Sequence, residues 1–353
     1  MHFHHLHFYV RDAAFWRNWF ASKLSFESVE QATCVSSPCA ERLRQGNVDI
    51  CLSDPASSVE AAQYLRKHPP GLVDIALATD RFEEDYARAK SQGASLTKPI
   101  TIGPDGMRQC QLHGWADLRH TLIEVSSSTY ALAGQHHEPA AVSPWLSAID
   151  HVVLNVDKGD LAIAASWYQR VFGLQRGQQF EISTANSGLR SQVLIHPTGT
   201  LQLPINEPSS ANSQIQEFLH HNQGAGAQHV ALRSQDAVSA IAHFRQQGLA
   251  LISVPKTYYD GLHQRADCPL QDTTAASRQQ LLLDWPKGGH QGLLMQTFTK
   301  PIFTEPTFFF EIIERTAYLE QGQLKSARGF GEGNFQALFE AIERAQLERG
   351  SLR

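Results

Sequence analysis

Two histidines and a glutamate in the second half of the chain lie in strand-like runs. His151 falls in "IDHVVLNV", His229 in "QHVALRS" and Glu311 in "TFFFEIIER". Strands that enter one curved sheet can point such side chains at a common centre. Two neutral imidazoles and one carboxylate on one side of a metal ion leave its other positions open, which is the facial triad of non-haem Fe(II) oxygen chemistry.

Glu311 also raises a question of burial, because it follows directly on Phe308, Phe309 and Phe310. A carboxylate in apolar surroundings is costly to bury unless its charge is compensated, and a bound cation would compensate it. The alternatives are ordinary. A strand histidine is commonly structural or exposed, the chain has 17 histidines, and Glu311 could face solvent. Spacing alone therefore leaves the triad open.

The elements that would position these residues occur twice, because the sequence repeats itself. "FHHLHFYVRDAAFWRNWF" at residue 3 echoes "IDHVVLNVDKGDLAIAASWYQRVFGL" at residue 149, and "GLVDIALATDRFEEDYARAK" at residue 71 echoes "GAQHVALRSQDAVSAIAHF" at residue 226. Each copy is a β-rich run followed by a helical pattern. The apolar positions of the first pair of helices are Phe15, Trp16, Trp19 and Phe20 in one copy and Leu161, Ala164, Tyr168 and Val171 in the other. Gly93 and Gly248 suit left-handed caps at the ends of the second pair.

Further strand-like runs, such as "QLLLDW" and "GLLMQTFT", follow the repeats. Together these patterns predict an α+β architecture of paired βαβββ units whose sheets curl around a central cavity. Residues 131–147 contain small residues and two prolines, so we expect them to link an N-terminal half, residues 1–130, to a C-terminal half, residues 148–353.

The chain ends in a helical pattern. Residues 334–347 carry an apolar stripe of Phe335, Leu338, Phe339 and Ile342, which predicts an amphipathic C-terminal helix docked on the second half. The preceding "GFGEG" contains three glycines that could act as a hinge if the helix closes over a pocket. The alternative is a static helix that only completes the core.

Bulk properties fit a folded protein of two domains. The 353 residues include 42% hydrophobic and 18% charged residues, which is not the composition of a disordered chain. A net charge of −5 and a pI near 6.4 give no reason to expect nucleic acid as a partner. No apolar run reaches membrane-span length, and no signal peptide is recognisable. Five scattered cysteines indicate reduced thiols, and we expect a cytoplasmic protein.

From about residue 148 to 350 the chain resembles the 4-hydroxyphenylpyruvate dioxygenase family of the vicinal-oxygen-chelate superfamily. The matching stretches, in family order, are "DHVVLNV", "LPINEP", "SQIQEFL", "GAGAQHVAL", "PKTYYD", "LLMQTFTKP", "PTFFFEIIER" and "GFGEGNFQALFEAIE". The resemblance implies an α+β fold of tandem βαβββ vicinal-oxygen-chelate modules forming two half-barrel domains. Residues 148–353 would form the catalytic domain with its closing helix. Residues 1–130 match only in the superfamily repeat and would form a scaffold without metal.

The resemblance also implies roles for single residues. His151, His229 and Glu311 fall on the three ligands of one Fe(II) per chain. The polar catalytic positions of the family's substrate pocket fall on Ser191, Asn206, Gln214, Gln228 and Gln296. The substrate-binding positions fall on the ring-sandwiching pair Phe309 and Phe335, on Phe298, Phe330 and Leu338 in the apolar wall, and on Asn334 near the closing helix. Aromatic neighbours suit a phenyl ring, and amides can hold a phenol or an oxo group without adding charge.

Simpler explanations exist for several of these residues when each is taken alone. Gln214 could be a solvated helix residue, and Gln228 could cover the end of a strand. Phe309 and Phe335 could be ordinary core residues, and Asn334 could be a helix N-cap.

The implied reaction converts 4-hydroxyphenylpyruvate and O2 to homogentisate and CO2, by oxidative decarboxylation, ring hydroxylation and side-chain migration. The 2-oxo acid is part of the substrate, so no separate 2-oxoglutarate is needed. The partners would be these small molecules, with no nucleic acid and no membrane, and the sequence leaves a homo-oligomer open.

Three alternatives compete with this reaction: 4-hydroxymandelate synthase, which hydroxylates the benzylic carbon, an extradiol catechol dioxygenase, and a non-enzymatic binding protein of the same fold. Pro204 and Asn206 in "LPINEP" favour the ring-hydroxylating branch. The "SQIQ" glutamine and the "GNFQALF" helix argue against the extradiol enzyme. The filled ligand positions argue against the binding protein.

The histidine-rich N-terminus invites a second metal hypothesis, because His5 falls where His151 falls in the repeat. Asp74 stands where the second half has His229, and "RHTLIEV" can be aligned to put either Leu122 or Glu124 opposite Glu311. We expect a half that has lost its site and serves as scaffold. The remaining histidines, expected on strand faces or frayed at the terminus, are His2, His4 and His7.

Overall fold

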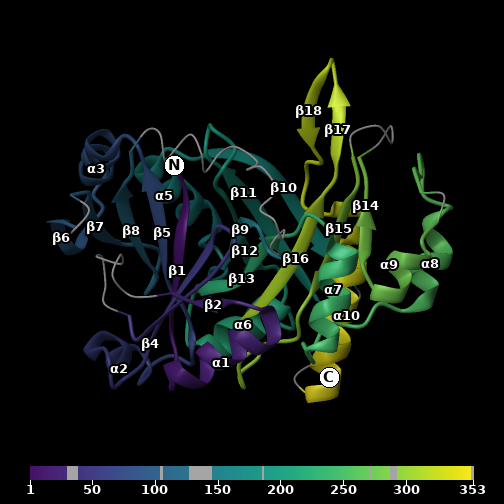
Figure 1. The fold of residues 1–353 in the computed structure, drawn as a ribbon, viewed down its shortest axis with the longest axis horizontal. Helices are drawn as coiled ribbons and strands as arrows, with labels where there is room; N and C mark the ends of the chain where they lie inside the picture. Colours follow the sequence, from purple (N-terminus) through teal and green to yellow (C-terminus); the bar gives the residue numbers. More distant parts are fainter. Residues whose placement is uncertain are drawn as a thin grey trace.

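The computed structural model describes residues 1–29, 39–103, 106–126, 145–184, 187–270, 272–286 and 292–350. It consists of two halves of similar architecture that lie side by side, the first in purple and blue and the second in green and yellow (Figure 1). Most of the expected linker, residues 131–144, lies outside the described residues.

Each half follows the predicted order of strands and helices. The first half contains β1 (His2–Tyr9), α1 (Ala13–Leu24), β2 (Glu27–Ser28), β3 (Glu41–Gln45), β4 (Val48–Ser53), α2 (Val59–Tyr64), β5 (Gly71–Thr79), α3 (Phe82–Ser91), β6 (Leu96–Ile102), β7 (Arg108–His113) and β8 (Arg119–Glu124). The second half contains β9 (Ala148–Asn155), α5 (Leu161–Phe172), β10 (Gln175–Ser183), β11 (Gly188–Ile195), β12 (Gln202–Pro208), α6 (Gln214–Asn222), β13 (Gly226–Arg233), α7 (Ala237–Gln246), α8 (Lys256–Leu262), α9 (Thr274–Gln279), β14 (Leu282–Asp284), β15 (Leu294–Phe298), β16 (Phe309–Arg315), β17 (Ala317–Glu320), β18 (Gln323–Ser326), a 3-10 turn (Glu332–Asn334) and α10 (Phe335–Arg349).

The two halves repeat one sheet topology. The strand order β2-β3-β4-β1-β5-β8-β7-β6 of the first sheet returns as β10-β11-β12-β9-β13-β16-β15-β14 in the second. In each sheet the two central strands are antiparallel, and each has a parallel partner on its other side. Each sheet therefore consists of two βαβββ modules and curls into a half-barrel, as the repeats predict.

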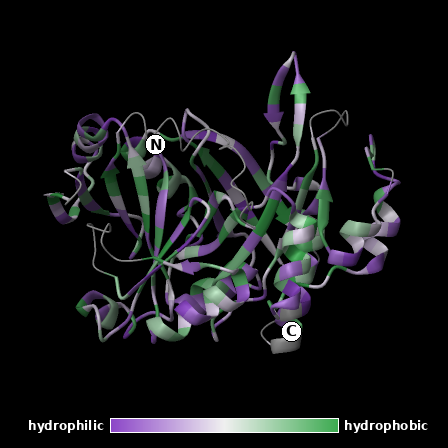
Figure 2. Ribbon diagram, viewed as in Figure 1, coloured by the Kyte–Doolittle hydropathy of each residue, from purple (hydrophilic) through white to green (hydrophobic). Residues whose placement is uncertain are grey.

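One core of buried apolar side chains extends through both halves. Many strands carry both hydrophobic and hydrophilic residues (Figure 2), and the central strands β5 and β9 are almost entirely buried. The predicted stripe of α5 is buried at all four positions, but in α1 Phe15 is 57% exposed and only its neighbours contribute to the core. The helix is therefore confirmed, whereas the assignment of Phe15 to its apolar face is wrong.

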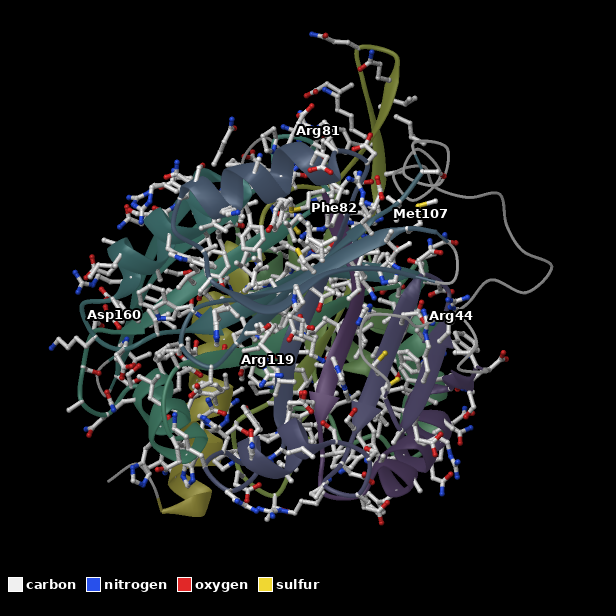
Figure 3. All side chains as sticks on the ribbon, turned by 90° about the vertical axis from the view of Figure 1, so that its left-hand side faces the viewer. Arg44, Arg81, Phe82, Met107, Arg119 and Asp160 are labelled. Atoms are coloured by element: carbon white, nitrogen blue, oxygen red, sulfur yellow. The ribbon has the colours of Figure 1, made fainter. Side chains whose placement is uncertain are left out.

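Helices of the two halves also contact each other. Figure 3 shows α3, which begins at Phe82, from the side of the first half. This helix packs against β8 of its own sheet and against α5 of the second half, where Arg88 Nε donates to the carbonyl oxygen of Val171 at 3.1 Å. Gly93 and Gly248 follow α3 and α7 with φ of +81° and +74°, the left-handed conformation that their positions predict.

The C-terminal helix α10 spans Phe335–Arg349, one residue later at its start and two residues longer at its end than the sequence pattern predicts. It lies alongside the second half at the end of the chain (Figure 1). No helix within the described ranges is long and apolar enough to cross a membrane.

Candidate metal centre and active site

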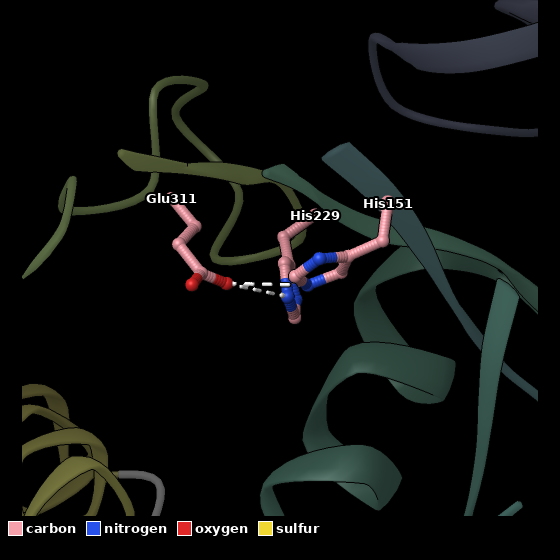
Figure 4. A group of neighbouring side chains, drawn as sticks. All are labelled: His151, His229 and Glu311. Carbon is pink, nitrogen blue, oxygen red and sulfur yellow. Dashed lines mark ion pairs between the residues drawn. The ribbon is translucent and has the colours of Figure 1, made fainter. Parts of the chain in front are cut away.

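The three candidate ligands lie on neighbouring central strands of the second sheet. Ala231 of β13 is opposite His151 of β9 on one side and opposite Glu311 of β16 on the other. His229 lies two residues before Ala231, so its side chain emerges on the same face. This register brings all three side chains to one point (Figure 4).

The geometry of the triad suits a small cation. Glu311 Oε2 lies 3.3 Å from His151 Nε2 and 3.6 Å from His229 Nε2. The three ligand atoms all lie within 4.8 Å of one another, and each residue is less than a tenth exposed. Glu311 Oε1 is buried and has no hydrogen-bond partner among the described residues. An orphaned carboxylate oxygen beside two imidazoles fits a bound metal, and this donor set suits Fe(II).

A buried carboxylate orients the first histidine. His151 Nδ1 lies 2.9 Å from Asp150 Oδ1, which leaves Nε2 directed at the centre. Asp150 Oδ2 accepts from Arg233 at 2.6 Å, and Asp150 Oδ1 accepts from Arg315 at 2.7 Å. Asp150 can reach its neighbour because a β-bulge interrupts the pairing of β9 with β13 at this point.

A second bulge explains why two consecutive residues, Gln228 and His229, both serve the site. The pairing with β9 shifts between Ala227 and His229, so Gln228 is the extra residue. Its Oε1 lies 3.1 Å from His229 Nδ1 and accepts a hydrogen bond from the ring N–H, which again leaves Nε2 free for a metal. Bulges often re-aim side chains next to active sites.

The pKa values of the three triad residues are shifted in different directions when no metal is bound. Burial opposes a charged imidazole, but the Glu311 carboxylate and Asp150 outweigh it and raise the pKa of His151 to about 9. Burial lowers the pKa of His229. Burial would raise the pKa of Glu311, but the two histidines, His151 foremost, hold it below its ordinary value. A metal entering at neutral pH must therefore displace a proton from His151.

A cavity of roughly 680 Å³, counting its mouth, opens beside the triad. Ten of the eleven pocket residues singled out in the sequence line it: Ser191, Asn206, Gln214, Gln228, Gln296, Phe298, Phe309, Phe330, Phe335 and Leu338. Gln214 is 7% exposed, so it is not a solvated helix residue.

The aromatic side chains around the cavity are set against the triad and against each other. The Phe309 ring stacks on His229 at 4.7 Å between centroids, and the Phe330 ring meets His151 edge-on at 5.3 Å. Phe335 meets Phe180 edge-on at 5.0 Å. These contacts give the cavity an apolar wall next to a polar centre.

Asn334 is the one residue of the eleven that does not line the cavity. It is fully buried outside the cavity lining, and its Oδ1 accepts from the Tyr258 hydroxyl at 2.7 Å. Asn334 occupies the N-cap position of α10, as the alternative predicts, but its side chain makes no capping hydrogen bond to a backbone N–H of the helix. The contact ties the start of α10 to α8.

Sequence reasoning assigned no place in the pocket wall to several other lining residues, most of which are single apolar residues on strands and carry no distinguishing signal. They are Val153, Phe180, Ile182, Leu189, Val193, Pro204, Phe339 and Ile342. Alternation with His151 could have identified Val153, and the predicted stripe of the C-terminal helix already contained Phe339 and Ile342.

The first sheet shows which residues stand at the equivalent positions. His5 of β1 lies opposite Ala76 of β5, just as His151 of β9 lies opposite Ala231 of β13 in the second sheet. The constant register of β5 with β8 then puts Thr121 opposite Ala76, at the place of Glu311. All four N-terminal histidines lie within β1 and are not frayed.

The alignment of the third N-terminal position to Leu122 or Glu124 is therefore wrong, because the register selects Thr121. Asp74, at the place of the second histidine, accepts from the Thr121 backbone N–H at 2.9 Å and from Gln111 Nε2 at 2.7 Å. Glu124 forms an ion pair with Arg108 at 2.6 Å. The Asp74 carboxylate is therefore already engaged in hydrogen bonds with its own half of the protein.

Comparisons with known proteins agree with the fold. Residues 148–274 match the model of the Glyoxalase/Bleomycin resistance protein/Dioxygenase superfamily. A triple mutant of 4-hydroxymandelate synthase from Streptomyces coelicolor has a similar fold, with a TM-score of 0.80 at 22% identity over 98% of each chain. The half-barrels and the triad thus define a member of the vicinal-oxygen-chelate superfamily.

Two curated relatives narrow this class. The 4-hydroxyphenylpyruvate dioxygenase of Pyricularia oryzae is 36% identical over 85% of this chain and 74% of its own length. That of Aspergillus fumigatus is 30% identical over 99% of this chain and 93% of its own length. The chain belongs to the 4-hydroxyphenylpyruvate dioxygenase family, and it is a dioxygenase.

Proposed function

We propose that the protein converts 4-hydroxyphenylpyruvate and O2 to homogentisate and CO2, with one Fe(II) per chain. The observation that carries the proposal is the buried triad at an aromatic-walled cavity, in a chain of this family. Bound Fe(II) would supply the activation of O2 that decarboxylation and ring hydroxylation need.

The protein's own residues hold and orient the reacting groups. His151, His229 and Glu311 would hold the metal next to the cavity, where the 2-oxo acid end of the substrate would bind. Asp150 and Gln228 keep the two imidazoles in the tautomer that presents Nε2. The triad therefore fixes where the 2-oxo acid end of the substrate must lie.

The cavity wall places the aromatic ring. Phe309 and Phe335 contact the ring faces, and Phe298, Phe330 and Leu338 complete the apolar surface that excludes water. The polar side chains that orient the substrate are Ser191, Asn206, Gln214, Gln228 and Gln296. A misplaced ring would send the oxidant to another carbon, so these residues govern the product as well as the rate.

Product analysis tests the proposal. The protein is reconstituted with Fe(II) without O2, mixed with 4-hydroxyphenylpyruvate and air, and its products are separated by chromatography. We expect homogentisate. A benzylic hydroxylation product would instead assign the protein to the 4-hydroxymandelate synthase reaction, and the absence of substrate-dependent CO2 release would refute both.

A matched pair of variants on β16 makes the test specific. Glu311→Gln removes the carboxylate charge from the triad and should abolish turnover. Glu314 lies three residues further on and accepts from the Ala237 backbone N–H at 2.7 Å, away from the cavity. Glu314→Gln keeps that acceptor, so its turnover should match the wild type.

A further inference from the structure

Asn155 lies on the same strand as the first metal ligand, at the other end of the cavity. Alternation along β9 puts His151, Val153 and Asn155 on one face, and the first two line the cavity. Four residues at a rise of about 3.3 Å separate His151 from Asn155 by roughly 13 Å. That span suits an aromatic ring with a chelating chain at one end and a polar group at the other.

Three polar residues form a row across neighbouring strands at this end. Asn155 of β9 is in register with Asn206 of β12, and Asn206 is in register with Ser191 of β11. Asn206 and Ser191 line the cavity, whereas Asn155 is fully buried outside its lining. Asn155 thus acts only through its neighbour.

The contact between the two asparagines sets the direction of the Asn206 amide. Asn206 Nδ2 donates to Asn155 Oδ1 at 3.3 Å. With its nitrogen end turned to β9, Asn206 offers its carbonyl oxygen, an acceptor, to the cavity. Without Asn155 the amide could rotate and offer either end.

Asn155 makes this contact at a cost to the fold. Its Nδ2 is buried and finds no hydrogen-bond partner in the described part of the chain. A buried unpaired donor destabilises the folded state, and an apolar residue of the same shape would avoid that penalty. A role in recognition explains why an amide stands there.

We propose that Asn155 is a positioning residue that fixes Asn206 as a hydrogen-bond acceptor, and thereby makes the cavity selective for aromatic 2-oxo acids with a hydroxyl donor on the ring. A ring without the hydroxyl would leave the Asn206 oxygen buried and unpaired, which should lower kcat/KM on the order of tenfold to a hundredfold. The assignment of the chelating end rests on the proposed function.

The test compares 4-hydroxyphenylpyruvate with phenylpyruvate, which lacks the hydroxyl. In Asn155→Leu the Asn206 amide can rotate, so the preference in kcat/KM should fall to about threefold or less. The change should appear mainly in the KM of the hydroxylated substrate, while thermal stability is equal or higher. A purely structural role predicts instead that both substrates lose activity equally, and that result would overturn the proposal.

Two further variants complete the design. Asn155→Asp keeps an acceptor for Asn206 Nδ2 and should restore the preference. Thr297 is fully buried outside the cavity lining, and its hydroxyl has no partner among the described residues. Thr297→Val therefore makes the same kind of replacement without touching Asn206, and the preference should stay at the wild-type value. Loss of preference in Thr297→Val would contradict the account.

A binding measurement keeps this inference separate from the proposed function. Calorimetry of the metal-loaded protein without O2 compares 4-hydroxyphenylacetate with phenylacetate, neither of which needs turnover. Tighter binding of the hydroxylated ligand in the wild type, lost in Asn155→Leu, supports the inference even if no homogentisate forms. Equal binding of both ligands, or a wild-type preference for the ring without a donor, would refute it even if homogentisate does form.

Discussion

His151 owes its orientation to Asp150, a residue that no spacing in the sequence distinguishes. Asp150 lies between the imidazole and two arginines that are 83 and 165 residues away in the chain. Although burial alone would raise it, Arg315 and Arg233 hold the pKa of Asp150 well below its ordinary value. The carboxylate therefore stays ionised and would make the imidazole a better ligand for the proposed metal.

Replacing Asp150 by Asn should weaken the metal site and the fold together. We expect metal affinity in a chelator competition to fall about 10- to 100-fold. Because Arg315 loses its buried counter-charge, the free energy of unfolding should fall by about 3 kcal/mol. Asp49 is the control, since it binds Arg42 and Arg44 in the first half. Asp49→Asn should lower stability with unchanged metal affinity, and equal loss of affinity in both variants would contradict the account.

Metal binding should also depend on pH through His151. Its pKa of about 9 in the metal-free protein lies above the ordinary value, so the imidazolium stabilises the fold fully below about pH 6.5. That stabilisation is lost as the pH rises through about 9. The metal competes with the same proton, so its affinity should increase from pH 6.5 towards 9. Calorimetry in buffers of different ionisation enthalpy should show proton release at pH 7, and a pH-independent affinity would contradict the shift.

The types of the site residues could be predicted from sequence, but their exact geometry could not. Strand periodicity and the repeat predict that His151, His229 and Glu311 lie on strands, but only the structure shows that these strands are neighbours at the centre of one sheet. The bulges at Asp150 and Gln228 depend on pairing between distant strands, which no local pattern encodes. Strand pairing also decides which residue of the first half corresponds to Glu311. Local alignment suggested Leu122 or Glu124, whereas the register of β5 with β8 selects Thr121.

At the scale of elements, the turn before α10 depends on its glycines. Gly329 and Gly331 have φ of +93° and +77°, a conformation that other residues rarely adopt. A Cβ on Gly331 would also overlap the amide of Gln296, a residue of the cavity wall. The glycines therefore allow a close approach between the turn and the site. Their role as a hinge for a closing helix stays a prediction.

Two glycine variants separate the cost of the backbone conformation from the cost of displacing Gln296. Gly322, in the turn between β17 and β18, also has φ of +77°, but a Cβ there would meet no described atom within 4 Å. Gly322→Ala should lower the free energy of unfolding by only about 1 to 2 kcal/mol, the cost of the backbone conformation. Gly331→Ala should lower it further and reduce the homogentisate formed per CO2 released, because Gln296 is displaced. Identical behaviour of the two variants would show that the contact with Gln296 is unimportant.

At the scale of the whole molecule, the first half supports the strand that carries Glu311. Alternation along β16 turns Phe309 and Glu311 to the cavity and Phe310 to the core. Phe8 of β1 meets the rings of Phe308 and Phe310, at 5.1 and 6.3 Å between centroids. Packing interactions between the halves thus help to hold Glu311, the proposed metal ligand, in place.

The repeat in the sequence was sufficient to predict paired βαβββ units with curled sheets, and the family resemblance added the two half-barrels. The repeat could not predict the packing of one half on the other. Phe8 lies in β1 of the first half, whereas Phe308 lies directly before β16 and Phe310 within it in the second half, so their contact depends on tertiary packing.

The central claim is that one metal centre, formed by the second half alone, serves each chain. Iron titration of the purified protein, with the bound metal counted per chain, tests it most directly. We expect saturation near one equivalent, near-complete loss of iron in folded His151→Ala, His229→Ala and Glu311→Ala variants, and full occupancy in His5→Ala. Full iron occupancy in any of the three triad variants would contradict the claim, and so would a second tight equivalent that disappears in His5→Ala.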